Sequence, residues 1–299
     1  MFNGTFVALV TPFKDGKINE KKLIELVEWQ ISEGIDGLVP LGSTGESSTL
    51  SHEEHARVIE VVVKAVRKRV AVVAGAGSNS TKEAISLTQE AKDLGADAVL
   101  SVNPYYNRPT QEGLKAHFSA IAKGVNIPII LYNIPFRTGV TLTVDTIAEL
   151  ASSNKTIVGV KESTGSMDQT SEILQKTDGK FFVLSVDDSL TIPLMALGAQ
   201  GVISVLANLV PRSIIDMVKT AAAGNYGAAR EAHLKLFPLI KSMFIESNPG
   251  PIKAAMFEAG LLDDDSLRLP LVAVTPETRN VIKAILREAG VKASVSSSK

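Results

Sequence analysis

The sequence is most restrictive in what it lacks. Its 299 residues include no cysteine and one tryptophan. Disulfide bonds, thiolate metal sites and a cysteine nucleophile are therefore excluded. Lys+Arg 31 against Asp+Glu 32 leaves a formal net charge of -1, so no basic excess indicates a nucleic-acid surface. The N-terminus lacks a signal-peptide pattern, and no apolar run is long enough to cross a bilayer. We expect a cytoplasmic protein.

What the sequence does contain is a repeated alternation of short apolar runs and amphipathic segments. Each run is nearly continuous, which is typical of strands buried on both faces. Eight such strands with helices between them predict an α/β fold, a closed (β/α)8 TIM barrel. An open doubly wound sheet is the alternative, but no G-x-G-x-x-G follows the first run. The runs are Phe6–Val10, Gly37–Val39, Val70–Ala74, Ala98–Val102, Ile127–Tyr132, Ile157–Val160, Phe181–Val186 and Gly201–Val205.

The pattern becomes helical after residue 224. Three helices are expected, at Tyr226–Ile245, Ile252–Leu261 and Pro276–Ala289, before a small, polar tail over 292–299. We therefore divide the chain into a catalytic barrel, 1–224, and a helical extension packed on it, 225–299. Capping boxes are expected at three helix starts, where a serine precedes Glu or Gln by three residues. These pairs are Ser51 with Glu54, Ser80 with Glu83, and Ser166 with Gln169.

Lys161 follows the apolar run Ile157–Val160 and so lies at the carboxyl end of a predicted strand. In such barrels, the chemistry takes place on the loops after the strands. Burial would lower the pKa of the amine, and a neutral amine can attack a carbonyl to form a Schiff base. Taken alone, a lysine at a strand end is more often an ordinary solvated or paired lysine, and the rest of the chain must decide.

Other strand ends carry residues that suit the same chemistry. Ser43 and Thr44, between two glycines, could present donors to an anion, although a plain turn would have the same composition. Tyr132 could transfer a proton, or be a core tyrosine. Arg137 could bind a carboxylate in bidentate fashion, or lie on the surface. Together with Lys161 they favour Schiff-base catalysis on a small α-keto acid.

An acidic pair, Asp187-Asp188, also follows a predicted strand. The pair could suggest a metal ion, which carboxylate oxygens can bind. No histidine or third carboxylate is expected near it, so we predict no metal site.

At these residues the chain resembles the dihydrodipicolinate synthase family of the N-acetylneuraminate lyase superfamily. The resemblance covers nearly the whole chain. The superfamily motifs are Gly42-Ser43-Thr44-Gly45-Glu46, Tyr132-Asn133-Ile134-Pro135 and Gly159-Val160-Lys161-Glu162. The motifs typical of the synthases are Pro135-Phe136-Arg137-Thr138-Gly139 and Asn103-Pro104-Tyr105-Tyr106-Asn107-Arg108-Pro109.

The resemblance implies a role for each matching residue. Lys161 forms an imine with pyruvate, without a cofactor or metal, and Ser43 and Thr44 hold the pyruvate carboxylate. Thr44, Tyr132 and Tyr106 form a proton relay, with Tyr106 contributed across a subunit interface. Arg137 binds the carboxylate of L-aspartate 4-semialdehyde, and Ile203 lines the pyruvate pocket. The resemblance further implies a homotetramer, a dimer of dimers, that serves lysine and diaminopimelate biosynthesis.

Inhibition by L-lysine is also implied, because the residue types of the effector cleft of lysine-inhibited members are present. The matching positions are Ser47, Ser48, His52, His55, Asn79, Glu83 and Tyr105. A local explanation competes with this one. His52 and His55 lie in the first turns of a predicted helix, and Glu83 could simply complete a capping box with Ser80.

Val186 departs from the family, which commonly has glycine there. A β-branched residue does not easily take a left-handed conformation, and the side chain could narrow the entry of the second substrate. Two alternatives to the synthase reaction remain, and Val186 bears on the first. The protein could be another aldolase or lyase of the superfamily, acting on sialic acid or a sugar acid. It could also be a binding barrel that has lost activity.

Overall fold

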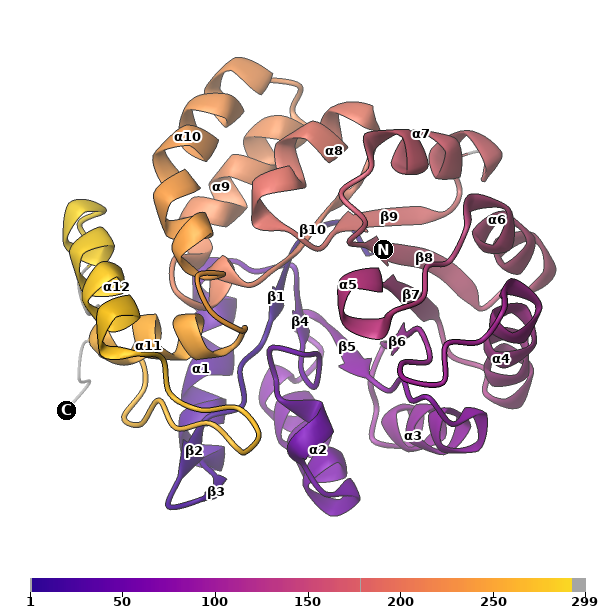
Figure 1. Cartoon of the computed structure of the whole chain (residues 1–299), viewed down its shortest axis with the longest axis horizontal. Helices are drawn as coiled ribbons and strands as arrows, with labels where there is room; N and C mark the ends of the chain where they lie inside the picture. Colours follow the sequence, from indigo (N-terminus) through magenta and orange to yellow (C-terminus); the bar gives the residue numbers. More distant parts are fainter. Residues whose placement is uncertain (1, 178, 292–299) are drawn as a thin grey trace.

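The computed structural model describes residues 2–177 and 179–291. In this part of the chain, eight parallel strands close into a barrel in the order β1-β10-β9-β8-β7-β6-β5-β4, with β1 pairing β4. Figure 1 shows these strands at the centre of the molecule with helices arranged around them. The predicted TIM barrel is therefore confirmed. The barrel strands are β1 (Gly4–Ala8), β4 (Gly37–Val39), β5 (Ala71–Gly75), β6 (Ala98–Val102), β7 (Ile129–Asn133), β8 (Ile157–Glu162), β9 (Phe182–Ser185) and β10 (Gly201–Ser204). A hairpin, β2 (Phe13–Lys14) and β3 (Lys17–Ile18), follows β1.

Helices connect successive strands on the outside of the barrel. Those of the barrel are α1 (Glu20–Glu33), α2 (His52–Val66), α3 (Thr81–Asp93), α4 (Gln111–Gly124), α5 (Pro135–Thr138), α6 (Val144–Ser153), α7 (Met167–Lys176), α8 (Thr191–Leu197) and α9 (Pro211–Ala222). Short 3-10 turns cover Ser47–Thr49, Asp188–Leu190 and Leu206–Asn208. Three further helices follow, α10 (Tyr226–Ser242), α11 (Gly250–Glu258) and α12 (Pro276–Glu288), as the helical pattern predicted.

Neighbouring residues along each strand face opposite sides, which gives the molecule two cores. One lies inside the barrel and includes Phe6, Leu100 and Leu184. The other lies between strands and helices and includes Val7 and Val99. Both faces of every strand are thus apolar, which is why the runs are continuous in the sequence.

The structure differs from the sequence-based prediction at the ends of some elements. Strand β8 continues through Lys161 and Glu162. The lysine is therefore paired with β7 as the second-last residue of the strand and does not follow the strand. Strand β1 ends at Ala8, two residues early, because the Val10 N–H donates to the Asn208 side chain. No helix in the described ranges has the length and apolar character that a membrane span requires. The tail over 292–299 lies outside the described residues.

Of the three expected capping boxes, only the one at α2 is complete, with reciprocal bonds between Ser51 and Glu54. At α3 and α7 the serine caps the helix, but the partner side chain bonds elsewhere. Glu83 accepts from the Ser78 hydroxyl, and Gln169 donates to Glu162. Tertiary contacts thus outcompete the local bond at both sites.

Candidate active site

Lys161 and Tyr132 are direct neighbours across β8 and β7. The Lys161 amine lies 4.4 Å from the centre of the Tyr132 ring, and the lysine is only 5% exposed. Burial lowers the pKa of Lys161 to about 7, with a smaller opposing effect from the charge of Asp188 and a further lowering by Arg137. A substantial fraction of this amine is therefore neutral near pH 7 and able to attack a carbonyl.

Tyr132 is buried as well, and its phenol remains protonated. Burial raises the pKa of Tyr132 to about 12, against smaller lowering effects of Arg137 and of a hydrogen bond with Ser43. A neutral phenol beside a neutral amine can donate a proton to an oxygen that is attacked there, and can take it back. Tyr132 belongs to the interior core and its ring also faces the amine, a position that suits proton transfer.

The two hydroxyls follow β4 in a segment of unusual backbone conformation. Leu41 and Glu46, which bracket it, both have positive φ, 64° and 56°. Such angles are costly for residues other than glycine, so surrounding contacts must hold the segment in place. Thr44 is 3% exposed, and the Asn248 side chain donates to its Oγ1 at 2.9 Å.

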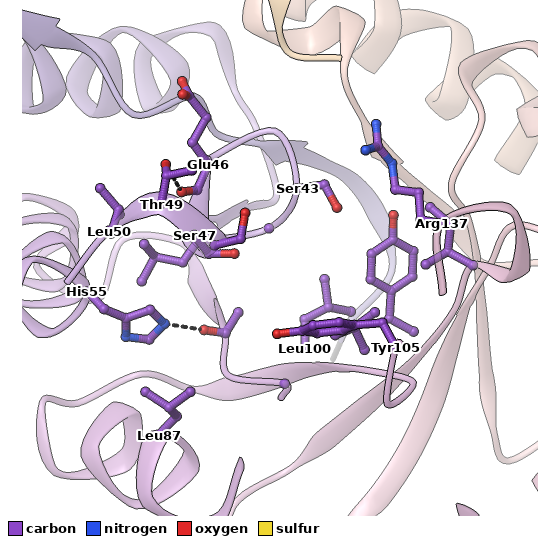
Figure 2. A pocket seen from close by; sticks show the side chains of 18 of the residues that line it. Ser43, Glu46, Ser47, Thr49, Leu50, His55, Leu87, Leu100, Tyr105 and Arg137 are labelled. Carbon is purple, nitrogen blue, oxygen red and sulfur yellow. Dashed lines mark hydrogen bonds between the residues drawn. The ribbon is translucent and has the colours of Figure 1, made fainter. Parts of the chain in front are cut away.

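Arg137 lies in α5, a single turn that begins with Pro135 immediately after β7. Its guanidinium donates to the backbone oxygen of Asn248 at 3.3 Å. Figure 2 shows Arg137 and Ser43 facing the same open space from opposite sides. A substrate carboxylate in that space would meet a charged donor on one side and a hydroxyl on the other.

Asn248 is a site residue that the sequence analysis did not identify. It lies just before α11 and contacts both Thr44 and Arg137. In the sequence it is one asparagine before a Pro-Gly-Pro turn, which has an ordinary explanation as a helix break. Its separation of 204 positions from Thr44 left no local signal of the contact.

The open space is a cavity of about 420 Å³ above the barrel interior. Ser43, Tyr132, Arg137 and Asn248 line it. Lys161 does not line it, and its amine lies against the ring of Tyr132, which does. Thr44 does not line it either, and its hydroxyl is bonded to the lining residue Asn248. A small substrate would therefore reach the amine past the tyrosine ring.

The same cavity extends sideways to six of the seven residues considered for lysine binding, leaving only Asn79 out. These six are Ser47, Ser48, His52, His55, Glu83 and Tyr105. His52 pairs with Glu83 at 3.0 Å, and His55 bonds the Gly75 carbonyl at 2.9 Å. Hydrogen bonds from Ser78 and His52 lower the pKa of Glu83 despite partial burial. This sideways extension, the arm of the cavity, therefore contains a carboxylate that stays charged at neutral pH. In Figure 2 the Tyr105 ring reaches into the cavity.

Two further predicted residues lie elsewhere. Tyr106 is 92% exposed on the loop after β6 and does not line the cavity of its own chain. Ile203 is fully buried on β10, in the interior core with Tyr132.

Val186 does not have a positive φ, so the left-handed strain considered for it does not arise. Its N–H donates to the Glu162 carbonyl at 3.2 Å, and its side chain packs on the interior core.

Asp188, from the acidic pair, is fully buried and partnered by protein groups. It accepts from the Ser204 hydroxyl and from the Val205 and Leu206 N–H groups, each at 3.1 Å. Burial raises the pKa of Asp188 to about 6, although these bonds oppose the effect. Within 2–177 and 179–291, no cluster of three or more metal-ligating side chains is found.

Known proteins are similar to this chain over nearly its whole length. A model of the dihydrodipicolinate synthetase family matches residues 1–289. A 4-hydroxy-tetrahydrodipicolinate synthase from Syntrophus aciditrophicus is 52% identical over 291 residues, covering 97% of this chain and 99% of the relative. One from Geotalea daltonii is 53% identical over 288 residues, covering 96% and 99%.

Solved structures are equally similar. Dihydrodipicolinate synthase from Aquifex aeolicus has a TM-score of 0.96 and 47% identity, covering 98% of this chain and 100% of that one. The Acinetobacter baumannii synthase complexed with pyruvate gives 0.95 and 46%, covering 97% and 100%. The Cyanidioschyzon merolae synthase with lysine bound gives 0.94 and 38%, covering 97% and 99%. Given this similarity and its own lysine–tyrosine pair, the chain belongs to the dihydrodipicolinate synthetase family.

Proposed function

We propose that this enzyme is a 4-hydroxy-tetrahydrodipicolinate synthase, which condenses pyruvate with L-aspartate 4-semialdehyde in lysine and diaminopimelate biosynthesis. The observation that carries the proposal is the buried Lys161 amine, with its pKa lowered to about 7, against the Tyr132 ring. The names of its relatives specify the same reaction.

In the proposed mechanism, the neutral Lys161 amine attacks the ketone carbon of pyruvate and forms a C–N bond. Tyr132 protonates the developing oxygen, and loss of water gives the iminium. The iminium withdraws electrons, so the Tyr132 oxygen, which has given up its proton, takes one from the neighbouring methyl group and an enamine forms. The enamine carbon then attacks the aldehyde carbon of the semialdehyde, Tyr132 returns the proton to the aldehyde oxygen, and the iminium is regenerated. Water or the amino group of the semialdehyde adds to the iminium carbon and displaces Lys161 as the free amine, so no metal or cofactor is required.

The remaining residues bind and orient the two substrates. Ser43 and Thr44 hold the pyruvate carboxylate, and Ile203 closes the pocket below it. Arg137 binds the semialdehyde carboxylate at the mouth of the cavity, where a guanidinium fork matches a carboxylate. Tyr106, highly exposed in a single chain, reaches the relay with Thr44 and Tyr132 in a neighbouring subunit. This role requires an oligomer, for which we propose a homotetramer in the cytoplasm.

We also propose that L-lysine inhibits the enzyme from the arm of the cavity lined by His52, His55, Glu83 and Tyr105. The Glu83 carboxylate would pair with the ammonium of the effector. A related synthase has been solved with lysine bound. Titrating activity with L-lysine at fixed pyruvate tests the idea, and Glu83→Gln should weaken inhibition. A flat curve up to millimolar lysine would dismiss it.

The reaction is tested by coupling condensation to the next reductase and by trapping the pyruvate adduct with borohydride. Trapping followed by peptide mapping should label Lys161. Lys161→Ala should lose several orders of magnitude in turnover, because the covalent step disappears. Normal turnover by that variant would refute the role. A panel of α-keto acids and aldehydes, including sialic and sugar acids, checks the second substrate, and a preference for a sugar would overturn the synthase assignment.

A further inference from the structure

Glu46 ends the segment that carries the Ser43 and Thr44 hydroxyls, but its side chain does not face the centre of the cavity. Figure 2 shows its side chain directed away from the space between Ser43 and Arg137. Glu46 is 1% exposed and has a φ of 56°, unfavourable for a residue with a side chain. Its backbone bonds the segment on both sides, to the Ser43 oxygen and from the Thr49 N–H. The Glu46 backbone is thus joined by a hydrogen bond to Ser43, three positions before it.

The partner of Glu46 comes from the helices that follow the barrel. Lys253 on α11 is 0% exposed, and its amine lies 2.7 Å from Glu46 Oε1. The same amine donates to the Ser266 carbonyl at 2.7 Å and lies 4.3 Å from the Phe13 ring centre. Both side chains of the Lys253–Glu46 pair are thus fully buried.

The other carboxylate oxygen of Glu46 has a partner of its own, Arg268. The Arg268 N–H donates to Glu46 Oε2 at 3.0 Å. The Arg268 guanidinium lies 4.7 Å from the Phe13 ring centre and binds both oxygens of Glu54 on α2, at 2.5 and 2.6 Å. Both oxygens of Glu46 are therefore bound by residues more than 200 positions away.

Stability is a weak explanation for this arrangement. Desolvation offsets most of the attraction in a buried ion pair, and apolar replacement of both partners is often neutral. A strained segment, in contrast, needs outside contacts to hold one geometry. We propose that Lys253 is a positioning residue, which fixes the Ser43–Thr44 hydroxyls for pyruvate through Glu46. The inference rests on the proposed function, in which those hydroxyls hold the pyruvate carboxylate.

The experiment compares wild type with Lys253→Met and with the double variant Lys253→Met/Glu46→Gln. Borohydride trapping at varied pyruvate gives the rate and apparent affinity of capture, and thermal unfolding gives stability. Lys253→Met should slow capture about 10- to 100-fold and raise the KM for pyruvate, because small displacements of binding groups have effects of this size. The KM for the semialdehyde should change by less than about twofold. Lys253→Met leaves the buried Glu46 carboxylate without its lysine partner, and the double variant removes that charge. The double variant should therefore unfold at a higher temperature than Lys253→Met, while its pyruvate capture stays slow.

Arg279→Met is the matched control. Arg279 on α12 pairs with Glu258 and Asp265, both after the barrel, and does not contact Glu46. Its loss should lower stability but leave capture within about twofold of wild type. Capture at the wild-type rate in Lys253→Met, or recovery of capture together with stability in the double variant, would overturn the inference. If Lys253→Met does not fold, the double variant alone decides. Wild-type pyruvate capture without condensation would refute the proposed function and leave this inference standing.

Discussion

Replacing Lys161 with methionine should abolish the chemistry and, at neutral pH, stabilise the protein. Methionine fills a similar volume without a charge. In the folded chain burial lowers the pKa of Lys161 from 10.5 to about 7, whereas the unfolded chain keeps the ordinary value. Between these two values the unfolded state binds more protons, so stability of the wild type rises with pH across this window. The buried lysine is therefore a cost that is largest at and below about pH 7.

The size of the cost follows from the same two values. One pKa unit corresponds to about 1.4 kcal/mol, so the cost approaches about 5 kcal/mol at low pH. Linkage gives about 4 kcal/mol near pH 7 and about 1 kcal/mol near pH 9.5. Since about 1 kcal/mol corresponds to about 2 °C in a chain of this size, Lys161→Met should unfold several degrees above wild type near pH 7.

Thermal unfolding at both pH values, at equal protein concentration, measures this difference. The advantage of Lys161→Met should shrink by about 6 °C between pH 7 and 9.5. Lys64→Met is the control, because Lys64 is an exposed partner of Glu60 and should show no such pH dependence. An advantage of Lys161→Met that is absent near pH 7, or constant with pH, would refute the claim that burial lowers the pKa of the native lysine to about 7.

Three further predictions concern the site. Arg137→Ala should raise the KM for the semialdehyde by about 100-fold, a few kcal/mol, and leave borohydride-trapped pyruvate unchanged; equal loss of both would contradict its assignment. The rate of pyruvate capture should increase with pH and level off above about pH 7, as the pKa of Lys161 requires, whereas a midpoint near 10 would contradict it. Asn248→Ala, which frees the Thr44 hydroxyl, should slow turnover by about tenfold, and activity equal to wild type would show that this contact does not matter.

Local patterns were sufficient for the architecture. Continuous apolar runs predicted the barrel strands because each strand contacts the interior core on one side and helices on the other. Strand ends were misplaced by one or two residues, since a strand stops where hydrogen-bond partners change, as at Val10 with Asn208. Two capping boxes were wrong for the same reason, because Glu83 and Gln169 found partners outside their own helix.

By itself, the sequence determined the closed α/β barrel, the family, and the lysine, tyrosine and arginine at the strand ends. These features depend on periodicity and on residues within a few positions of one another. Only the tertiary structure decided the protonation state and placement of the site. The pKa of Lys161 is set by its burial in the closed barrel, and Thr44 and Glu46 are held by Asn248 and Lys253 from beyond the barrel. Burial depends on the closure of all eight strands, and the last two contacts join residues more than 200 positions apart, so no local pattern of residues encodes either effect.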